Sequence, residues 1–255
     1  MIELKTAPEI EAMRAAGRVV ATVHAEVRAH AAPGVSLLEL DEVARKVIDG
    51  AGAGSSFLGY HPRFGATPYP GVICTSVNEI MLHGLPTTYR LRDGDLLSVD
   101  CGAHVDGWHA DAAVSFVVGT ARAEDLELIE TAERTLAAGI AAAQPGGHMG
   151  DIGHAMATIG REAGYGMQND FGGHGIGRAM HEEPFVPNDG RPGRGFRLQP
   201  GLVIAIEPSL MAGGHDGYHM ADDGWSLVTD DGSRSVHVEH TVAITDEGPR
   251  VLTLP

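Results

Sequence analysis

Apolar residues recur at helical spacing in two pairs of segments along the chain. The first helix begins after the capping-box pattern Thr6-Ala7-Pro8-Glu9 and must end before Pro33-Gly34. The segment Ser36 to Glu39 repeats the capping-box spacing at the start of the second helix. The other three helices are predicted over 36–50, about 124–143 and 151–163.

Strand patterns follow each pair of helices. Val72–Val77 and Leu96–His104 are apolar runs, and Trp108–Val118 alternates like a half-buried strand. The stretch Gly52–Gly71 is rich in Gly and Pro, which predicts a loop, and the last third of the chain returns to strands. The pattern therefore predicts an α/β protein.

The two halves of the chain repeat one another. The turn Pro33-Gly34 between the first two helices is echoed 112 residues later by Pro145-Gly146 between the second two. Gly94 stands six residues before Asp100, as Gly201 stands six before Glu207, each pair joined by an apolar run. We predict one domain over 1–255, built from pseudo-symmetric helix-helix-strand-strand halves of about 1–119 and 120–255, with a site at the seam.

Two aspartates are predicted to share one face of a hairpin. Asp106-Gly107 is a strong signal for a two-residue turn, which would pair Val105 with Trp108. Asp100 and Asp111 then become diagonal neighbours on one face, in largely apolar company. Like charges buried together need a cation or a proton, whereas two solvated aspartates on an exposed face are the alternative.

The second half supplies two more acids. Glu207 ends the apolar run Leu202–Ile206, and Pro208 then blocks continuation of a central strand. Glu239 lies in the strand-like segment Ser235–Ile244, which could pair back toward Trp225–Val228. Four carboxylates at the seam would be neutralised by two divalent cations, and such ligands with some imidazole suit Mn, Fe, Co or Zn.

Three histidines stand near bends or glycines. His174 lies in Phe171–Gly177, whose glycines permit close backbone approach, and His83 and His181 sit beside Gly or Pro. Each alone is more often a satisfied or solvated side chain than a ligand. The serine signature G-x-S-x-G and the zinc signature H-E-x-x-H are both missing, so metal-activated water is the nucleophile left.

The amino-acid composition further limits the class of protein to which the chain can belong. The chain has 255 residues, 43% of them hydrophobic and 20% charged, which is typical of a globular protein. A net charge of −16 disfavours nucleic acid and anionic membranes as partners, and two cysteines do not make a disulfide scaffold. No apolar targeting segment or membrane span is visible in the sequence, so we expect a cytoplasmic protein.

These motifs together resemble those of type I methionine aminopeptidases over nearly the whole chain. The motifs occur in the order typical of that family: SVNE, the HG at His83, Asp100, Asp111, GHGIG around His174, HEEP at His181, IEP at Glu207 and EHT at Glu239. The resemblance implies the pita-bread fold with a central antiparallel sheet. It also implies a hydrolase that excises the N-terminal methionine of nascent proteins and peptides when the second residue is small.

The resemblance implies roles for individual residues. Two divalent metal ions would be bound, with two bridging carboxylates, Asp111 and Glu239. Glu207 would also be the general base, and His83 and His181 would face the substrate. The expected ligands are Asp100, Asp111, His174, Glu207 and Glu239, and the expected walls of the methionine pocket are Tyr69, Cys74, Trp225 and Tyr60.

The chain departs from many relatives at two places near this pocket. The stretch Pro62–Pro68 is longer, and Met180 replaces a phenylalanine before HEEP. Both bear on side-chain preference and leave the chemistry untouched. We expect a monomer that acts on peptide N-termini, and a ribosome contact stays open.

Two alternatives remain. An X-Pro aminopeptidase or dipeptidase shares the fold but usually carries a separate N-terminal domain, for which 255 residues leave no room. A non-catalytic peptide-binding protein of the same fold would typically have lost metal ligands, and all five positions are occupied here.

Overall fold

Four helices form in the computed structural model, which describes residues 2–62 and 67–255. They are α1 Ala7–His30, α2 Leu37–Gly50, α3 Ala123–Ala142 and α4 Met149–Glu162, close to the predicted bounds. The Ser36 hydroxyl accepts the Glu39 N–H at 3.2 Å and the Glu39 carboxylate accepts the Ser36 N–H at 2.8 Å, so the predicted capping box starts α2. No helix among the described residues is long and apolar enough to cross a membrane.

Most strands of the described chain join one antiparallel sheet with the order β1-β4-β5-β13-β8-β6-β7, with β2 also paired to β4 and β14 to β13. Two small sheets, β10-β11-β3 and β12-β9, lie beside it. The strands of the main sheet are β1 Gly54–Ser55, β2 Cys74–Val77, β4 Asp95–Val105, β5 Trp108–Val118, β6 Gly173–Gly175, β7 Glu182–Val186, β8 Val203–Ile206, β13 Glu239–Thr245 and β14 Gly248–Val251. The remaining strands are β3 Ile80–Leu82, β9 Ser209–Met211, β10 Tyr218–Met220, β11 Leu227–Thr229 and β12 Ser235–His237.

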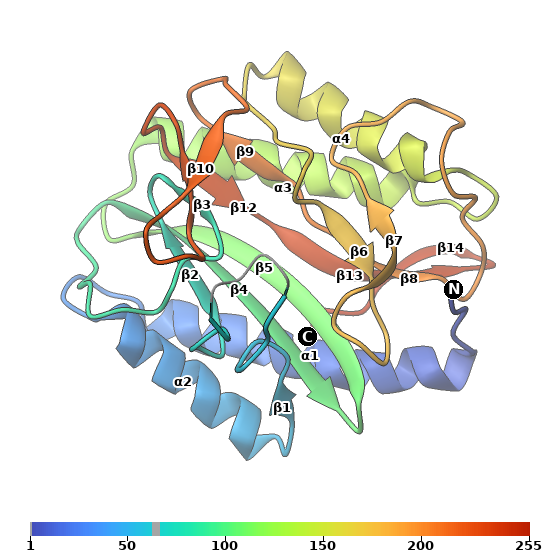
Figure 1. The fold of residues 1–255 in the computed structure, drawn as a ribbon, viewed down its shortest axis with the longest axis horizontal. Helices are drawn as coiled ribbons and strands as arrows, with labels where there is room; N and C mark the ends of the chain where they lie inside the picture. The colour runs from blue at the N-terminus through green and yellow to red at the C-terminus, as the bar shows by residue number, and fades with distance from the viewer. Residues whose placement is uncertain (1, 63–66) are drawn as a thin grey trace.

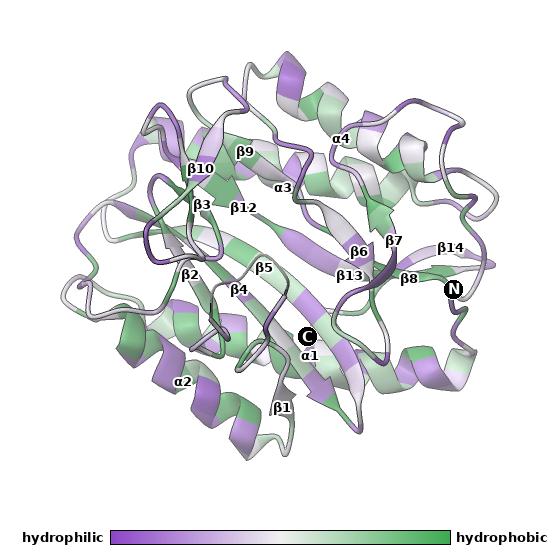
Figure 2. Cartoon of the chain, viewed as in Figure 1, coloured by the Kyte–Doolittle hydropathy of each residue, from purple (hydrophilic) through white to green (hydrophobic). Residues whose placement is uncertain are grey.

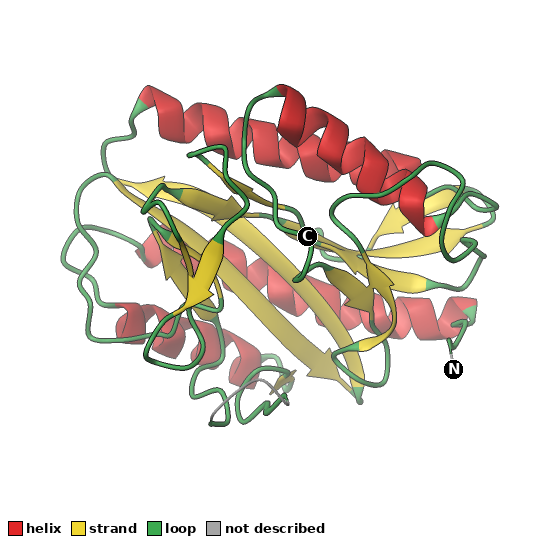
Figure 3. Cartoon of the chain, turned by 45° about the horizontal axis from the view of Figure 1, so that its top comes forward, coloured by secondary structure: helices red, strands yellow, loops and turns green. Residues whose placement is uncertain are grey.

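Each helix pair packs on its own part of the sheet. α1 lies behind β4 and β5, and α3 and α4 run side by side along the other end of the sheet (Figure 1, Figure 3). Buried residues such as Val20 and Leu40 meet Val99 in one core cluster, and Leu128 and Met156 belong with Ile204 to a second. Hydrophilic residues interrupt β5 and β13 in this mostly apolar sheet (Figure 2), so polar groups lie at the middle of the molecule.

The predicted hairpin is confirmed. Asp106 and Gly107 both have positive φ, 51° and 75°, as a two-residue turn of this type requires, and Val105 pairs with Trp108. Asp100 pairs with Ala113 in this register. Asp111, two residues from Ala113, therefore points to the same face of the sheet as Asp100.

The expected path of the last strands is wrong in one respect. Ser235–Ile244 is not one strand paired with Trp225–Val228, because it changes sheets at Val238. β12 pairs with β9, and β13 then pairs with β5 and β8. β11 instead lies between β10 and β3, a strand that the sequence did not predict. Alternation of apolar and polar residues predicts a strand but does not name its partner.

A side chain extends the contact between β5 and β13. Their backbone ladder covers only Glu239 opposite Ala113 and His240 opposite Ala112. One residue further, the buried Thr241 hydroxyl accepts the Asp111 N–H at 2.9 Å and donates to the Asp111 carbonyl at 2.8 Å. Both backbone groups of Asp111 are thus satisfied, which fixes the position of its carboxylate.

Candidate metal centre

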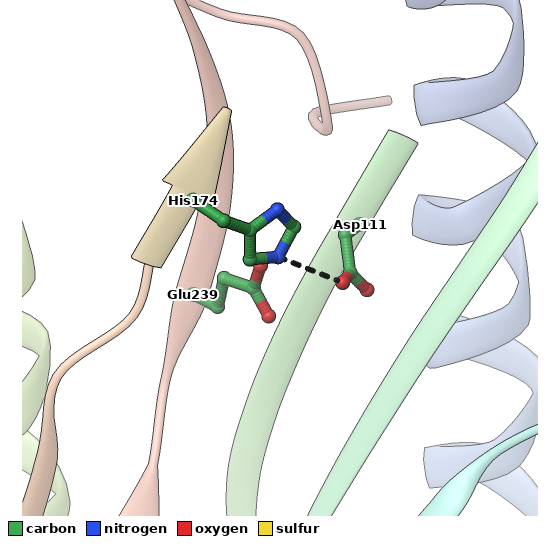
Figure 4. A group of neighbouring side chains, drawn as sticks. All are labelled: Asp111, His174 and Glu239. Atoms are coloured by element: carbon green, nitrogen blue, oxygen red, sulfur yellow. Dashed lines mark ion pairs between the residues drawn. The ribbon is translucent and has the colours of Figure 1, made fainter. Parts of the chain in front are cut away.

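Five strands or strand ends bring the five expected ligands together. Asp100 lies on β4, Asp111 on β5 and His174 on β6, Glu207 directly follows β8, and Glu239 begins β13. Asp111 and Glu239 are only 3% and 1% exposed, so they sit inside the protein. Figure 4 shows Asp111, His174 and Glu239 turned toward one another from three strands.

The His174 imidazole faces the carboxylates. Its Nε2 lies 3.8 Å from Asp111 Oδ2 and 3.6 Å from Glu207 Oε1. Its Nδ1 lies 2.9 Å from the Gly175 carbonyl, so Nδ1 carries the proton and the Nε2 lone pair faces the acids. Asp111, His174 and Glu239 each offer a ligand atom within 4.8 Å of the others, which is the spacing of a cation site.

The glycines around His174 allow neighbouring segments to pack closely against the backbone of β6. A Cβ on Gly173 would lie 2.1 Å from the Ala205 carbonyl oxygen, and one on Gly175 would lie 2.2 Å from that of Glu183. The sequence led us to expect close approach to whatever the imidazole binds. The close approaches at Gly173 and Gly175 are between neighbouring segments, which places His174 between β7 and β8. Gly172 of the same segment lines the cavity with His174.

The acids are not satisfied by the protein alone. Within residues 2–62 and 67–255, buried oxygens of Asp100, Asp111 and Glu239 have no hydrogen-bond partner. Burial raises the pKa of Asp111 to about 7, and burial with neighbouring carboxylates raises the pKa of Asp100, Glu207 and Glu239 well above the usual values. Burial also lowers the pKa of His174 to about 4, which leaves a neutral ligand nitrogen. This donor set suits divalent cations.

A cavity of about 470 Å³ opens onto these acids, and all four expected pocket residues line it. Tyr69 and Trp225 form a T-shaped wall with ring centroids 4.9 Å apart. The Trp225 indole N–H donates to the Thr67 carbonyl at 3.1 Å, and the Tyr69 hydroxyl lies 3.0 Å from the Gly84 carbonyl. Burial raises the pKa of the Cys74 thiol, so Cys74 contributes a neutral apolar surface.

The two expected substrate-facing histidines also line the cavity. His83 has φ 57° and packs edge-on against Trp225, with ring centroids 6.3 Å apart. His181 lies 4.2 Å from the His174 ring and 5.0 Å from the Tyr60 ring. Burial lowers the pKa of His83 to about 4 and that of His181 to about 3, so both act as neutral hydrogen-bonding groups at pH 7.

One buried residue beside the acids had no role in the sequence prediction. His237 is buried and its Nε2 lies 3.5 Å from Glu207 Oε2. In the predicted continuous strand Ser235–Ile244, its two-residue spacing from Glu239 could have drawn attention to it, because residues two apart in a strand share a face. Met180 lines the cavity, as its position before HEEP led us to expect, whereas residues 63–66 of the Pro62–Pro68 stretch lie outside the described residues.

Buried carboxylates and imidazole at the base of an apolar cavity define the class of a metal-dependent hydrolase. Residues 11–246 match metallopeptidase family M24, and the chain belongs to that family. The chain is 49% identical to methionine aminopeptidase 1 of Mycobacterium tuberculosis, covering 100% of this chain and 96% of that protein. It is 42% identical to methionine aminopeptidase 1 of Bacillus subtilis, covering 99% of each.

Solved structures agree on the fold. Methionine aminopeptidase of Thermotoga maritima superposes with a TM-score of 0.95 at 37% identity over 100% of both chains. Prolidase of Pyrococcus furiosus shares the fold alone, with a TM-score of 0.76 at 23% identity, over 99% of this chain and 65% of that one. The pita-bread fold implied by the resemblance is thereby confirmed.

Metal removal should make the stability of the protein depend on alkaline pH. A carboxyl whose pKa is higher in the folded than in the unfolded state stabilises the fold below its unfolded pKa of about 4, and this stability is lost as pH rises through the folded pKa. The buried histidines, with lowered pKa values, contribute the opposite slope only below about pH 6.5. Between pH 7 and 8.5 we therefore expect the free energy of unfolding of the metal-free protein to fall.

Urea unfolding at several pH values, with and without Mn²⁺, measures this effect. Mn²⁺ should flatten the pH dependence, and Asp111→Asn should flatten it in the metal-free protein. A metal-free wild-type protein equally stable at pH 7 and 8.5 would contradict the charge repulsion inferred for the site.

Proposed function

We propose that this chain removes the N-terminal methionine from peptides and nascent polypeptides whose second residue is small, and that it needs two divalent metal ions, of Mn, Fe, Co or Zn type. The observation that carries this function is that an aromatic pocket adjoins the acids: Tyr69, Trp225 and Cys74 line the same cavity as Asp100 and Glu207. A long groove would suit an endopeptidase, whereas a pocket that ends at the reacting centre suits removal of one residue.

Five residues would hold the two cations, with Asp111 and Glu239 bridging and Asp100, His174 and Glu207 as terminal ligands. Their convergence and the unpartnered oxygens support this assignment. The bound cations would supply an activated water and positive charge beside the scissile carbonyl.

The protein groups divide the remaining work. Glu207 accepts the proton of the attacking water as general base, which its position at the cavity wall favours. His181 donates to the developing oxyanion, and His83 contacts the scissile amide nitrogen. Tyr69, Trp225, Cys74 and Tyr60 surround the methionine side chain, whose thioether makes favourable contacts with aromatic rings.

We propose further that the whole chain works as a single catalytic domain, a cytoplasmic monomer whose halves of about 1–119 and 120–255 both contribute ligands. Asp100 and Asp111 come from the first half and His174, Glu207 and Glu239 from the second. The substrate is a free peptide N-terminus, and neither nucleic acid nor membrane is required. A ribosome contact would serve delivery of nascent chains and is not needed for the chemistry.

Peptide specificity tests the proposed function. His83 and His181 crowd the cavity next to the acids, so a large second residue should be excluded. We expect kcat/KM for Met-Ala-Ser to exceed that for Met-Lys-Ser by at least about tenfold, or about 1.4 kcal/mol, and Ala-Pro-Ala to remain uncleaved. Equal turnover of the two methionyl peptides would refute this specificity, and preferential cleavage of Ala-Pro-Ala would indicate an X-Pro peptidase.

Paired substitutions separate the general base from the bridging ligands. Glu207→Gln keeps the shape and one carbonyl oxygen but loses basicity, so kcat should fall by at least about a hundredfold while KM changes less. Asp111→Asn should instead lower metal content, because a bridging carboxylate contacts both cations. The measurement is metal content alongside kcat at saturating Mn²⁺. Near-normal kcat in Glu207→Gln with both metals bound would show that another group is the base.

A further inference from the structure

His237, which is not one of the five expected ligands, has a buried atom without a hydrogen-bond partner at the candidate metal centre. Among the described residues, the unpartnered atoms there include oxygens of Asp100, Asp111 and Glu239, and also Nε2 of His237. The His237 residue is only 3% exposed. Leaving a buried polar atom without a hydrogen-bond partner is energetically costly. A buried imidazole nitrogen that lacks a partner, as the carboxylate oxygens beside it do, is therefore a candidate metal ligand.

The geometry of His237 around Glu207 matches that of His174. Oε1 of Glu207 lies 3.6 Å from His174 Nε2, and Oε2 lies 3.5 Å from His237 Nε2. These separations exceed the roughly 2.7–3.2 Å of an N–H···O hydrogen bond. They equal the edge of a tetrahedron, about 3.3–3.6 Å, around a cation with bonds of about 2.0–2.2 Å.

Two candidate cation sites overlap at this point. Asp111, His174 and Glu239 form one, and Glu207, His237 and Glu239 form the other, with the ligand atoms of each group within 4.8 Å of one another. Both contain Glu239, and each has one imidazole. The arrangement provides two carboxylates and one nitrogen for each of two cations.

The backbone of His237 is held in place independently of any metal. The His237 N–H lies 3.1 Å from the Ser115 hydroxyl oxygen, and this hydroxyl donates to the His237 carbonyl at 2.8 Å. The Ser98 hydroxyl lies 2.7 Å from that of Ser115 and supports it. These buried contacts join the end of β12 to β4 and β5, so the imidazole is positioned before a cation binds.

We propose that His237 Nε2 is a sixth protein ligand, which coordinates one of the two cations together with Glu207 and Glu239. This assignment rests on the dinuclear centre of the proposed function and adds a nitrogen ligand to it. The centre then has two imidazoles, those of His174 and His237. Because imidazole suits Co, Zn and Fe better than Mn, His237 also shifts the metal preference of the protein toward those ions.

X-ray absorption of the Co²⁺-loaded protein counts the imidazoles. We expect two imidazoles per two Co²⁺ ions in the wild type and one in His237→Gln. Calorimetric titration should show at least about a tenfold weaker Kd for one Co²⁺ ion in that variant, with a smaller loss for Mn²⁺. The matched control is His240→Gln, because the His240 imidazole contacts Thr253 instead, with its Nδ1 2.8 Å from the Thr253 hydroxyl. This control should retain two imidazoles.

The experiment distinguishes failure of the His237 assignment from failure of the proposed function. One imidazole in a wild-type protein that binds two Co²⁺ ions and cleaves Met-Ala-Ser would overturn the role of His237 alone. Failure of the wild type to bind two Co²⁺ ions or to cleave the peptide would overturn the proposed function itself. The wild-type imidazole count decides the question even if His237→Gln does not fold.

Discussion

Mutual repulsion among buried carboxylates is the constraint on which the rest of this structure depends. Asp111 and Glu239 are almost fully buried, and Asp100 and Glu207 border them at the cavity wall. Burial of like charges is strongly unfavourable unless cations compensate them. The central strands therefore carry a cluster of acids that destabilises the metal-free protein. Such a cluster is expected of a functional site and not of a structural core.

The surrounding elements hold these groups against that repulsion. The β4–β5 hairpin fixes Asp100 and Asp111 on one face, and the Thr241 hydroxyl bonds both backbone groups of Asp111. Helices α1 and α2 cover one part of the sheet and α3 and α4 another, so the ligands stand on rigid strands backed by packed cores.

The sequence predicts the local features of this fold better than its pairings. Capping boxes and the Asp106-Gly107 turn are local signals, and the helices and the hairpin formed where they were predicted. The sheet change at Val238 was not predictable, because strand alternation carries no information about the partner strand. The same difficulty hid His237. Its approach to Glu207 arises from the pairing of β12 with β9, which places His237 opposite Ser209, two residues after Glu207.

The candidate site shows a similar division. The resemblance implied five ligand positions and the pocket walls, and the structure brings all of these residues to one cavity or its base. The glycines of the His174 segment also have a structural role that the sequence did not predict, since Gly173 and Gly175 permit close backbone contacts between β6 and its neighbours. Fourteen histidines occur in the chain, and only their three-dimensional placement separates those that face the acids from the rest.

We infer that two cations compensate the four buried acids. Anomalous diffraction from crystals grown with Mn²⁺ tests it most directly. We expect two anomalous peaks about 3.5–4 Å apart, both in contact with Asp111 and Glu239. The absence of any peak at these residues, or a single peak at full occupancy with saturating Mn²⁺, would contradict it.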